Sequence, residues 1–263
     1  STALGYGVPP AEAFPASLER KLHERRRPSG GGPLRVVNLA GNSEGAYAFV
    51  YNLRSYDSLD ADVALFYTGY NDLDGSNTYV FRNQSPVFRL TGYYPLLPLI
   101  FREKAMALRY GNVEAGYWSE RRGEPVVFRP NLARRSAASV LEASVKMSHA
   151  LEQQLARLTK DAPDQSGSSE EMGCETWNHY CRSLYVAVDH VLHRGKWAVV
   201  VTEPYLGEGH REQQRIMAAM LQRQFVANPK LRYINLGTLI DLKNPSLCYD
   251  GMHLTAQGNA RIA

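Results

Sequence analysis

The sequence has few cysteines, no long apolar run and no large excess of charge of either sign. Three cysteines in 263 residues are too few for a scaffold built on disulfides. The longest apolar stretch, residues 93–101, contains two prolines and is far shorter than the roughly 18 residues of a membrane span, so no transmembrane segment is predicted. The formal net charge of +4 is small for this length and argues against nucleic acid as a partner.

No basic region followed by an apolar stretch opens the chain, so no signal peptide is evident. Residues 1–8 have the glycine-containing character of a turn at the end of a strand. We therefore expect the first strand of the sheet upstream of residue 1. The compartment stays open, and a secreted or periplasmic location is compatible with the sequence.

The cysteines leave two alternatives. If Cys174 and Cys181 lay in one helix, they would be about 10 Å apart along its axis, which is beyond the reach of a disulfide. A bond therefore requires Cys174 to lie in the loop before the helix. Free buried thiols are the other alternative.

An apolar content of 44% and a charged content of 21% are ordinary for a globular protein, and one domain suffices for this length. Predicted strands alternate with predicted helices, which indicates an α/β fold with a mostly parallel sheet. Residues 73–130 are aromatic and proline-rich and give no clear assignment. The predicted strands are 34–39, 62–67, 196–202 and 231–236; the predicted helices are 10–27, 46–59, 136–158, 176–193 and 210–226.

Two early blocks carry residues suited to holding negative charge. Ser1 stands in a tight turn before a helix, where backbone N–H groups favour a developing anion. Gly45 ends the loop between a predicted strand and helix, and a glycine lets a backbone N–H approach a substrate oxygen closely. Gly41 in the same loop is a competitor for this role. Taken alone, either block is also compatible with an ordinary turn.

Two later blocks are more specific. Gly69-Tyr-Asn71-Asp72 directly follows an apolar strand, at the edge where α/β proteins bind ligands, so the Asn71 amide can donate to an oxyanion; a plain Asn-Asp turn is the alternative. Asp250 and His253 stand three residues apart at a helix entry. The carboxylate can then accept from Nδ1–H, which leaves Nε2 to take a proton.

Together the four blocks resemble the SGNH (GDSL-type) esterases and lipases. The matching residues are Ser1, Gly45, Gly69-x-Asn71-Asp72, and Asp250-x-x-His253 followed by Leu-Thr-x-x-Gly-Asn. Their order agrees with the family and spans nearly the whole chain. The resemblance implies a single hydrolase domain over residues 1–263, folded as a three-layer α/β/α flavodoxin-like sandwich with a five-stranded sheet. It also implies a helical, aromatic insertion at about residues 73–195.

The resemblance also implies the chemistry. Ser1 would be the nucleophile, His253 the general base and then acid, and Asp250 the residue that orients the imidazole. Ser1 N–H, Gly45 N–H and the Asn71 side chain would hold the oxyanion. The substrate would be a small-molecule, glycan or lipid ester, cleaved without metal or cofactor, or the acyl group would pass to another acceptor on the same site.

Other interpretations are compatible with the same residues. Aromatic and leucine residues of the insertion (Tyr93, Tyr94, Leu96, Leu97 and Trp118) would either cover the acyl site or form packed core. A serine at position 1 is also compatible with an N-terminal nucleophile hydrolase. Asp189, His190 and His193, or His179, suggest a metal site, but no third ligand of matching spacing stands nearby. A non-catalytic carbohydrate-binding protein is the alternative from another class, since sixteen tyrosines could line a sugar groove.

Overall fold

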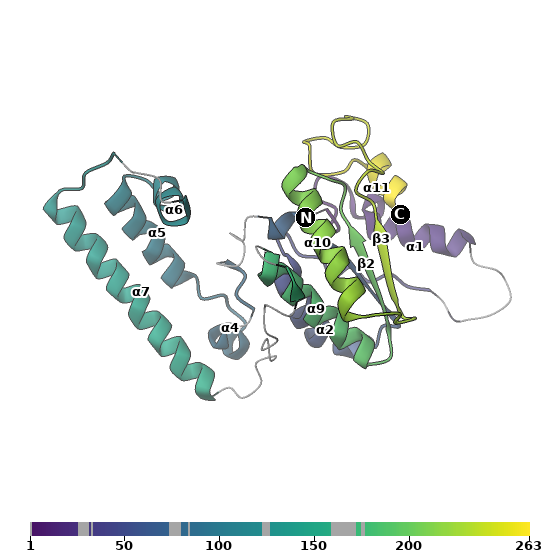
Figure 1. The fold of residues 1–263 in the computed structure, drawn as a ribbon, viewed down its shortest axis with the longest axis horizontal. Helices are drawn as coiled ribbons and strands as arrows, with labels where there is room; N and C mark the ends of the chain where they lie inside the picture. Colours follow the sequence, from purple (N-terminus) through teal and green to yellow (C-terminus); the bar gives the residue numbers. More distant parts are fainter. Residues whose placement is uncertain are drawn as a thin grey trace. The chain divides into compact units, whose positions relative to one another are not determined.

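The computed structural model describes residues 2–25, 32, 34–73, 80–83, 85–122, 127–158, 172–174 and 177–263. The chain divides into two compact units. Unit 1 comprises residues 1–77 and 165–263 and contains the sheet, and unit 2 comprises residues 78–164 and is helical in its described part (Figure 1). None of the described helices is both long enough and apolar enough to cross a bilayer.

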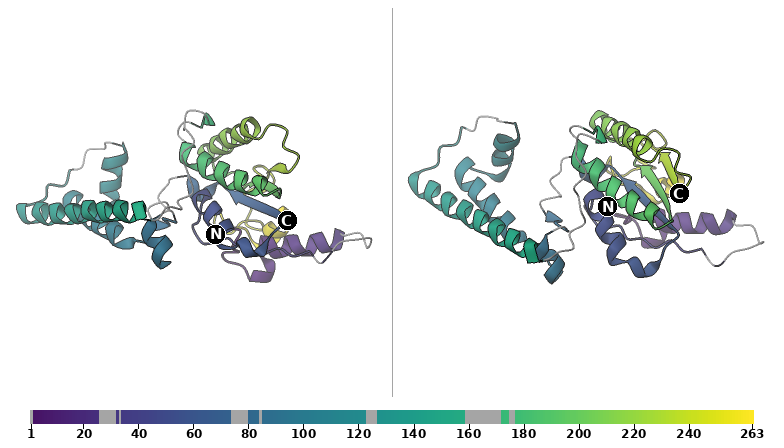
Figure 2. Two further views of the ribbon diagram at one scale, coloured as in Figure 1. Left: turned by 90° about the horizontal axis from the view of Figure 1, so that it is seen from below. Right: turned by 60° about the horizontal axis from the view of Figure 1, so that its bottom comes forward.

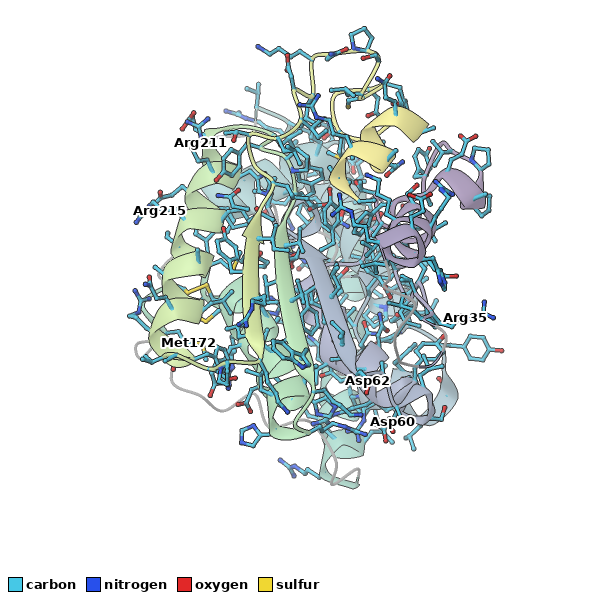
Figure 3. All side chains as sticks on the ribbon, turned by 90° about the vertical axis from the view of Figure 1, so that its right-hand side faces the viewer. Arg35, Asp60, Asp62, Met172, Arg211 and Arg215 are labelled. Atoms are coloured by element: carbon cyan, nitrogen blue, oxygen red, sulfur yellow. A yellow bond between two sulfur atoms is a disulfide. The ribbon has the colours of Figure 1, made fainter. Side chains whose placement is uncertain are left out.

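The sheet of unit 1 has three parallel strands in the order β1-β2-β3, which confirms the α/β class. The strands are β1 (Val63–Thr68), β2 (Trp197–Thr202) and β3 (Leu231–Asn235). Their register places Thr68 opposite Thr202 and Thr202 opposite Asn235, so the three carboxyl ends are level. In Figure 3 the strands run from the end near Asp62 towards the end near Arg211.

The predicted five-stranded sheet is wrong for the described residues, which contain three strands. Residues 34–39, predicted as a strand, join no ladder. The backbone N–H of Val36 donates instead to the carboxylate of Glu19, at 2.6 Å. An extended segment becomes a strand only when a neighbour pairs with its backbone, and β1 is paired with β2 on one side alone.

Helices cover both faces of this sheet. Alternate residues of a strand point to opposite sides, and in β2 both sets are apolar. Ala198 and Val200 of β2 belong to one apolar core, and Val199 and Val201 belong to the other. Figures 1 and 2 show α9 and α10 on one side and α1 and α11 on the other. The helices of unit 1 are α1 (Phe14–Arg25), α2 (Ala46–Ser55), α9 (Asn178–His193), α10 (Glu208–Gln224) and α11 (Ala256–Ile262), with 3₁₀ turns at Pro10–Glu12, Asp57–Leu59 and Tyr70–Asp72.

Of the two alternatives for Cys174 and Cys181, the disulfide is the one that the structure shows. Cys174 lies ahead of α9 and is bonded to Cys181 in the first turns of that helix, with 6.4 Å between the two Cα atoms. The disulfide is buried in the same core as α2 and α10. Cys248 is a buried free thiol.

Unit 2 contains α4 (Pro86–Thr91), α5 (Leu96–Tyr110), α6 (Val113–Arg122) and α7 (Leu132–Leu158). α5 packs along α7 and beside α6. Tyr94 stacks on Phe88 at 4.4 Å, whereas Tyr93 is 79% exposed and Leu97 63% exposed, so the aromatic segment is only partly core. The side chain of Trp118 lies outside the described residues. The helix α9, which the expected insertion at 73–195 included, packs in unit 1.

Candidate active site

The loop before α11 holds an aspartate and a histidine side by side. Oδ2 of Asp250 lies 2.6 Å from Nδ1 of His253. The other carboxylate oxygen accepts the backbone N–H groups of His253, at 2.7 Å, and Met252, at 2.9 Å. Gly251 makes this tight turn at φ +85°, a conformation that favours glycine. Since Nδ1 faces the carboxylate, Nε2 is the ring nitrogen suited to proton transfer.

The pKa of Asp250 shows that this carboxylate is held in its charged form. Partial burial alone raises the pKa, but the hydrogen bonds from the backbone and ring of His253 and from Met252 outweigh it and lower the pKa below its usual range. The side chain of His253 is only 15% exposed. The pair therefore combines a charged carboxylate with a largely buried imidazole in unit 1.

The N-terminal turn packs against this pair. The ring of Tyr6 lies 4.7 Å from the imidazole of His253, centroid to centroid. The hydroxyl of Tyr249 donates to the carbonyl of Tyr6 at 3.0 Å. A Cβ at Gly7 would lie 2.2 Å from that hydroxyl, so only glycine fits this approach. Ser1, the expected nucleophile, lies outside the described residues; its neighbour Thr2 is buried.

The same turn is tied to the loop before α2. The side-chain amide of Asn38 donates to the carbonyl of Ala3 at 2.9 Å, and its Oδ1 accepts the N–H of Ala40. The described part of the first block therefore contacts both the loop of residues 38–45 and the loop of His253.

The second and third blocks meet directly. The N–H of Ala46, the first residue of α2, donates to both carboxylate oxygens of Asp72, at 3.1 and 3.0 Å. The amide of Asn71 donates to the carbonyl of Glu44 at 2.7 Å. A Cβ at Gly45 would lie 2.5 Å from Oδ1 of Asp72, so this capping arrangement requires glycine. Burial raises the pKa of Asp72 to about 7, although the bond from Ala46 lowers it in part.

The structure distinguishes the two glycines of the loop. The N–H of Gly41 donates to Oε2 of Glu44 at 3.0 Å and is occupied within the loop. Gly45 is the N-cap residue of α2, and its N–H donates to no residue that the structure describes. Gly45 is therefore the better placed of the two to donate to a ligand.

Sequence reasoning missed two buried residues that position the Gly69–Asp72 turn. Oε2 of Glu203, directly after β2, accepts the N–H of Tyr70 at 2.7 Å, and the Tyr70 hydroxyl donates to the carbonyl of Pro204 at 2.5 Å. A Cβ at Gly69, which has φ +148°, would lie 2.3 Å from Nε2 of His210. Burial raises the pKa of Glu203 to about 7 and lowers that of His210 to about 4. A charged residue at the end of an apolar strand was the available signal for Glu203.

No cluster of three potential metal ligands occurs in the part of the chain that the structure describes. Nδ1 of His193 lies 3.0 Å from Oδ1 of Asp189, one turn earlier on α9. This contact joins an exposed histidine to a partly buried aspartate within one helix.

In comparisons with known proteins, no family model, no curated protein and no solved structure matches the chain.

Proposed function

We propose that the protein is a serine hydrolase that cleaves carboxylic esters through an acyl-enzyme. The observation that carries the proposal is the Asp250–His253 pair, 2.6 Å apart, with the N-terminal turn packed on its imidazole. In this proposal, residues 1–77 and 165–263 form an SGNH-type hydrolase unit of the flavodoxin-like three-layer class. Residues 78–164 form its insertion.

The three residues of the proposed triad have distinct tasks. Nε2 of His253 takes the proton of the Ser1 hydroxyl as Oγ attacks the ester carbonyl, and then gives that proton to the leaving alcohol. Asp250 fixes the tautomer and stabilises the imidazolium. A water molecule, activated by the same imidazole, then releases the acyl group and restores Ser1.

The oxyanion of the tetrahedral intermediate needs donors that are already in position. The proposal assigns Gly45 N–H, Asn71 and Ser1 N–H to this task. The Asn71 amide donates to the carbonyl of Glu44, which anchors the side chain beside Gly45. Asp72 and Glu203 are positioning residues, because their carboxylates accept the backbone N–H groups of Ala46 and Tyr70.

Covalent labelling tests the proposal. A fluorophosphonate probe should modify Ser1, identified by peptide mass spectrometry, and should fail to label the variant His253→Ala. His193→Ala removes an exposed histidine that pairs with Asp189, and it should label like the wild type. Hydrolysis of p-nitrophenyl esters from acetate to palmitate should follow the same pattern and show which acyl length is preferred. A protein that never labels, or one that labels equally without His253, would overturn the proposal.

A further inference from the structure

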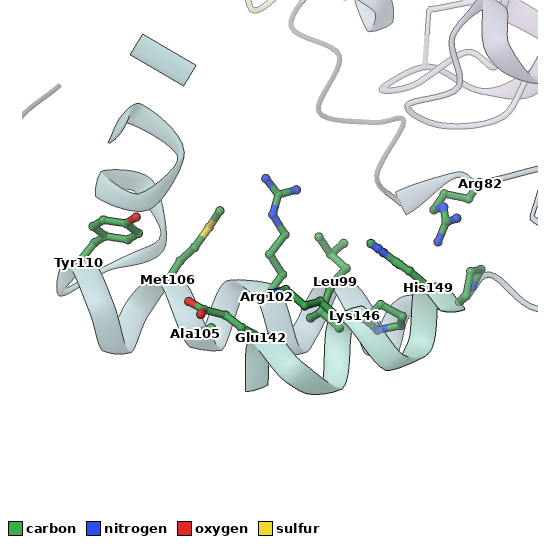
Figure 4. Close-up of a pocket in the computed structure, with 12 residues that line it drawn as sticks. Arg82, Leu99, Arg102, Ala105, Met106, Tyr110, Glu142, Lys146 and His149 are labelled. Atoms are coloured by element: carbon green, nitrogen blue, oxygen red, sulfur yellow. The ribbon is translucent and has the colours of Figure 1, made fainter. Parts of the chain in front are cut away.

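The helical unit contains a groove of about 480 Å³ that is lined entirely by its own residues. α5 and α7 supply most of the lining, as the close-up in Figure 4 shows. The volume lies within the range of small-molecule sites in proteins. None of the residues assigned to ester cleavage takes part in it, so the groove is a second feature to be explained.

The floor of the groove is apolar. Leu99 and Met106 of α5 and Val145 of α7 line it. Met106 is 3% exposed, and a Cβ at Gly116 of α6 would lie 2.7 Å from its Cβ. Met106 therefore packs under α6 and fixes the helices, and the partly exposed Leu99 and Val145 present the apolar surface to an aliphatic group.

The charges beside this floor are unequal. The one carboxylate among the lining residues, Glu142, pairs with Arg109 at 2.8 Å. Arg82, which also lines the groove, pairs with Glu152 at 2.8 Å. Lys146 forms no ion pair with any residue that the structure describes.

Lys146 and His149 stand three residues apart on α7 and therefore share one face of the helix. Arg102 of α5 also lines the groove, with its guanidinium 5.3 Å from the centre of the Tyr117 ring. The lining thus carries three cationic side chains, those of Arg82, Arg102 and Lys146, against one carboxylate, that of Glu142.

We propose that this groove binds an amphiphile with an aliphatic chain and an anionic headgroup. The chain lies along Leu99 and Val145, where it is removed from water, and the headgroup lies at Lys146 and His149. Free fatty acids and single-chain phospholipids share this chemistry. The inference depends on unit 2 alone and is independent of the proposed hydrolysis.

Titration calorimetry of the full chain tests the proposal. Sodium decanoate, kept below its micelle concentration, represents a fatty acid, and a lysophosphatidate represents a phospholipid; binding of at least one is expected. Octyl glucoside carries a chain without charge, decyltrimethylammonium carries the opposite charge, and inorganic phosphate carries charge without a chain. Each of these three should bind at least about tenfold more weakly, because both halves of the ligand contribute.

Variants locate the site. Lys146→Met keeps the apolar stem and removes the charge, and it should weaken decanoate binding about tenfold, the value of one charge-assisted hydrogen bond. Lys104→Met makes the same change at an exposed position of α5 outside the groove and should bind like the wild type. Val145→Gln tests the floor and should also weaken binding, with circular dichroism to verify the fold. Unchanged binding in Lys146→Met, equal binding of octyl glucoside, or no binding by the wild type would overturn the proposal.

Discussion

Asn71 is anchored by one amide N–H, which donates to the carbonyl of Glu44, and this makes its role testable separately from its packing. Asn71→Ala should lower the rate of ester hydrolysis by about 10²–10³, the usual cost of losing one oxyanion donor. The loss should appear in kcat with KM nearly unchanged, because the interaction is made in the transition state.

The matched control is Asn52→Ala. Asn52 donates its amide to the carboxylate of the same Glu44 at 3.2 Å, but the proposal gives it no contact with substrate. Its kcat should stay within a few-fold of the wild type. Equal losses in both variants would indicate that Asn71 only supports the loop.

Glu203 is a buried carboxyl group whose ionisation opposes folding. Its pKa is raised to about 7 from an ordinary value of 4.5, first of all by burial. Between these two values the native protein keeps the proton, whereas the unfolded chain has released it. The stability contributed by the neutral carboxyl is therefore complete below about pH 4.5 and is lost as the pH rises through about 7.

Glu203→Gln keeps an acceptor for the Tyr70 N–H and removes this titration. We expect the free energy of unfolding to fall less between pH 5 and pH 7.5 in the variant than in the wild type, as measured by urea denaturation at both values. A residual fall remains, since Asp72 is raised to about 7 as well. Glu24→Gln, on the exposed end of α1, should leave the wild-type pH dependence unchanged. An identical dependence in Glu203→Gln would contradict the assignment.

The residues of the candidate site differ in how far the sequence predicts them. The Asp250–His253 contact was predictable because it is local: three residues and one glycine turn bring the two side chains together. Glu203 could be singled out as a charged residue at the end of an apolar strand, but the contacts of Glu203 and His210 with Tyr70 and Gly69 were not predictable, because they depend on the parallel register of β1 and β2. No pattern along the chain contains that register.

At the scale of elements, most helices and strands of unit 1 follow from periodicity. The one predicted strand that does not form has a definite physical cause. Residues 34–39 have the apolar content of a strand, but strand formation also needs a pairing partner, and the Val36 N–H bonds to Glu19. The aromatic region was unassignable because prolines, such as Pro95 and Pro98, interrupt the helical pattern; the structure places both at the start of α5, where proline is tolerated.

The disulfide at the start of α9 allows a test at the scale of elements. The bond joins residues seven apart, and closing so short a loop stabilises the fold by about 2–3 kcal/mol in the chain-entropy model. Cys181→Ser should lower the free energy of unfolding by about that amount in urea denaturation. Reductant should lower the stability of the wild type similarly and leave that of Cys181→Ser unchanged. A reductant effect that persists in the variant would argue against this origin.

At the scale of the whole molecule, the chain consists of two units with separate interiors. The sheet and the disulfide belong to unit 1, and the core of unit 2 lies between α5, α6 and α7. The sequence predicts an insertion but not its bounds, because α9 has the same helical periodicity as α7. Only its packing on β2 and α2 assigns α9 to unit 1.

Separate interiors predict separate unfolding transitions. Ala138 on α7 and Ala187 on α9 are both fully buried, one in each unit. Ala138→Asp buries an unpaired charge in unit 2, a change that costs several kcal/mol, and should lower the melting temperature of one calorimetric transition. Ala187→Asp should lower the other and abolish fluorophosphonate labelling, which Ala138→Asp should leave intact. A single transition that moves in both variants would show that the two units fold as one cooperative body, and the groove and the ester site would then have to be treated as parts of one system.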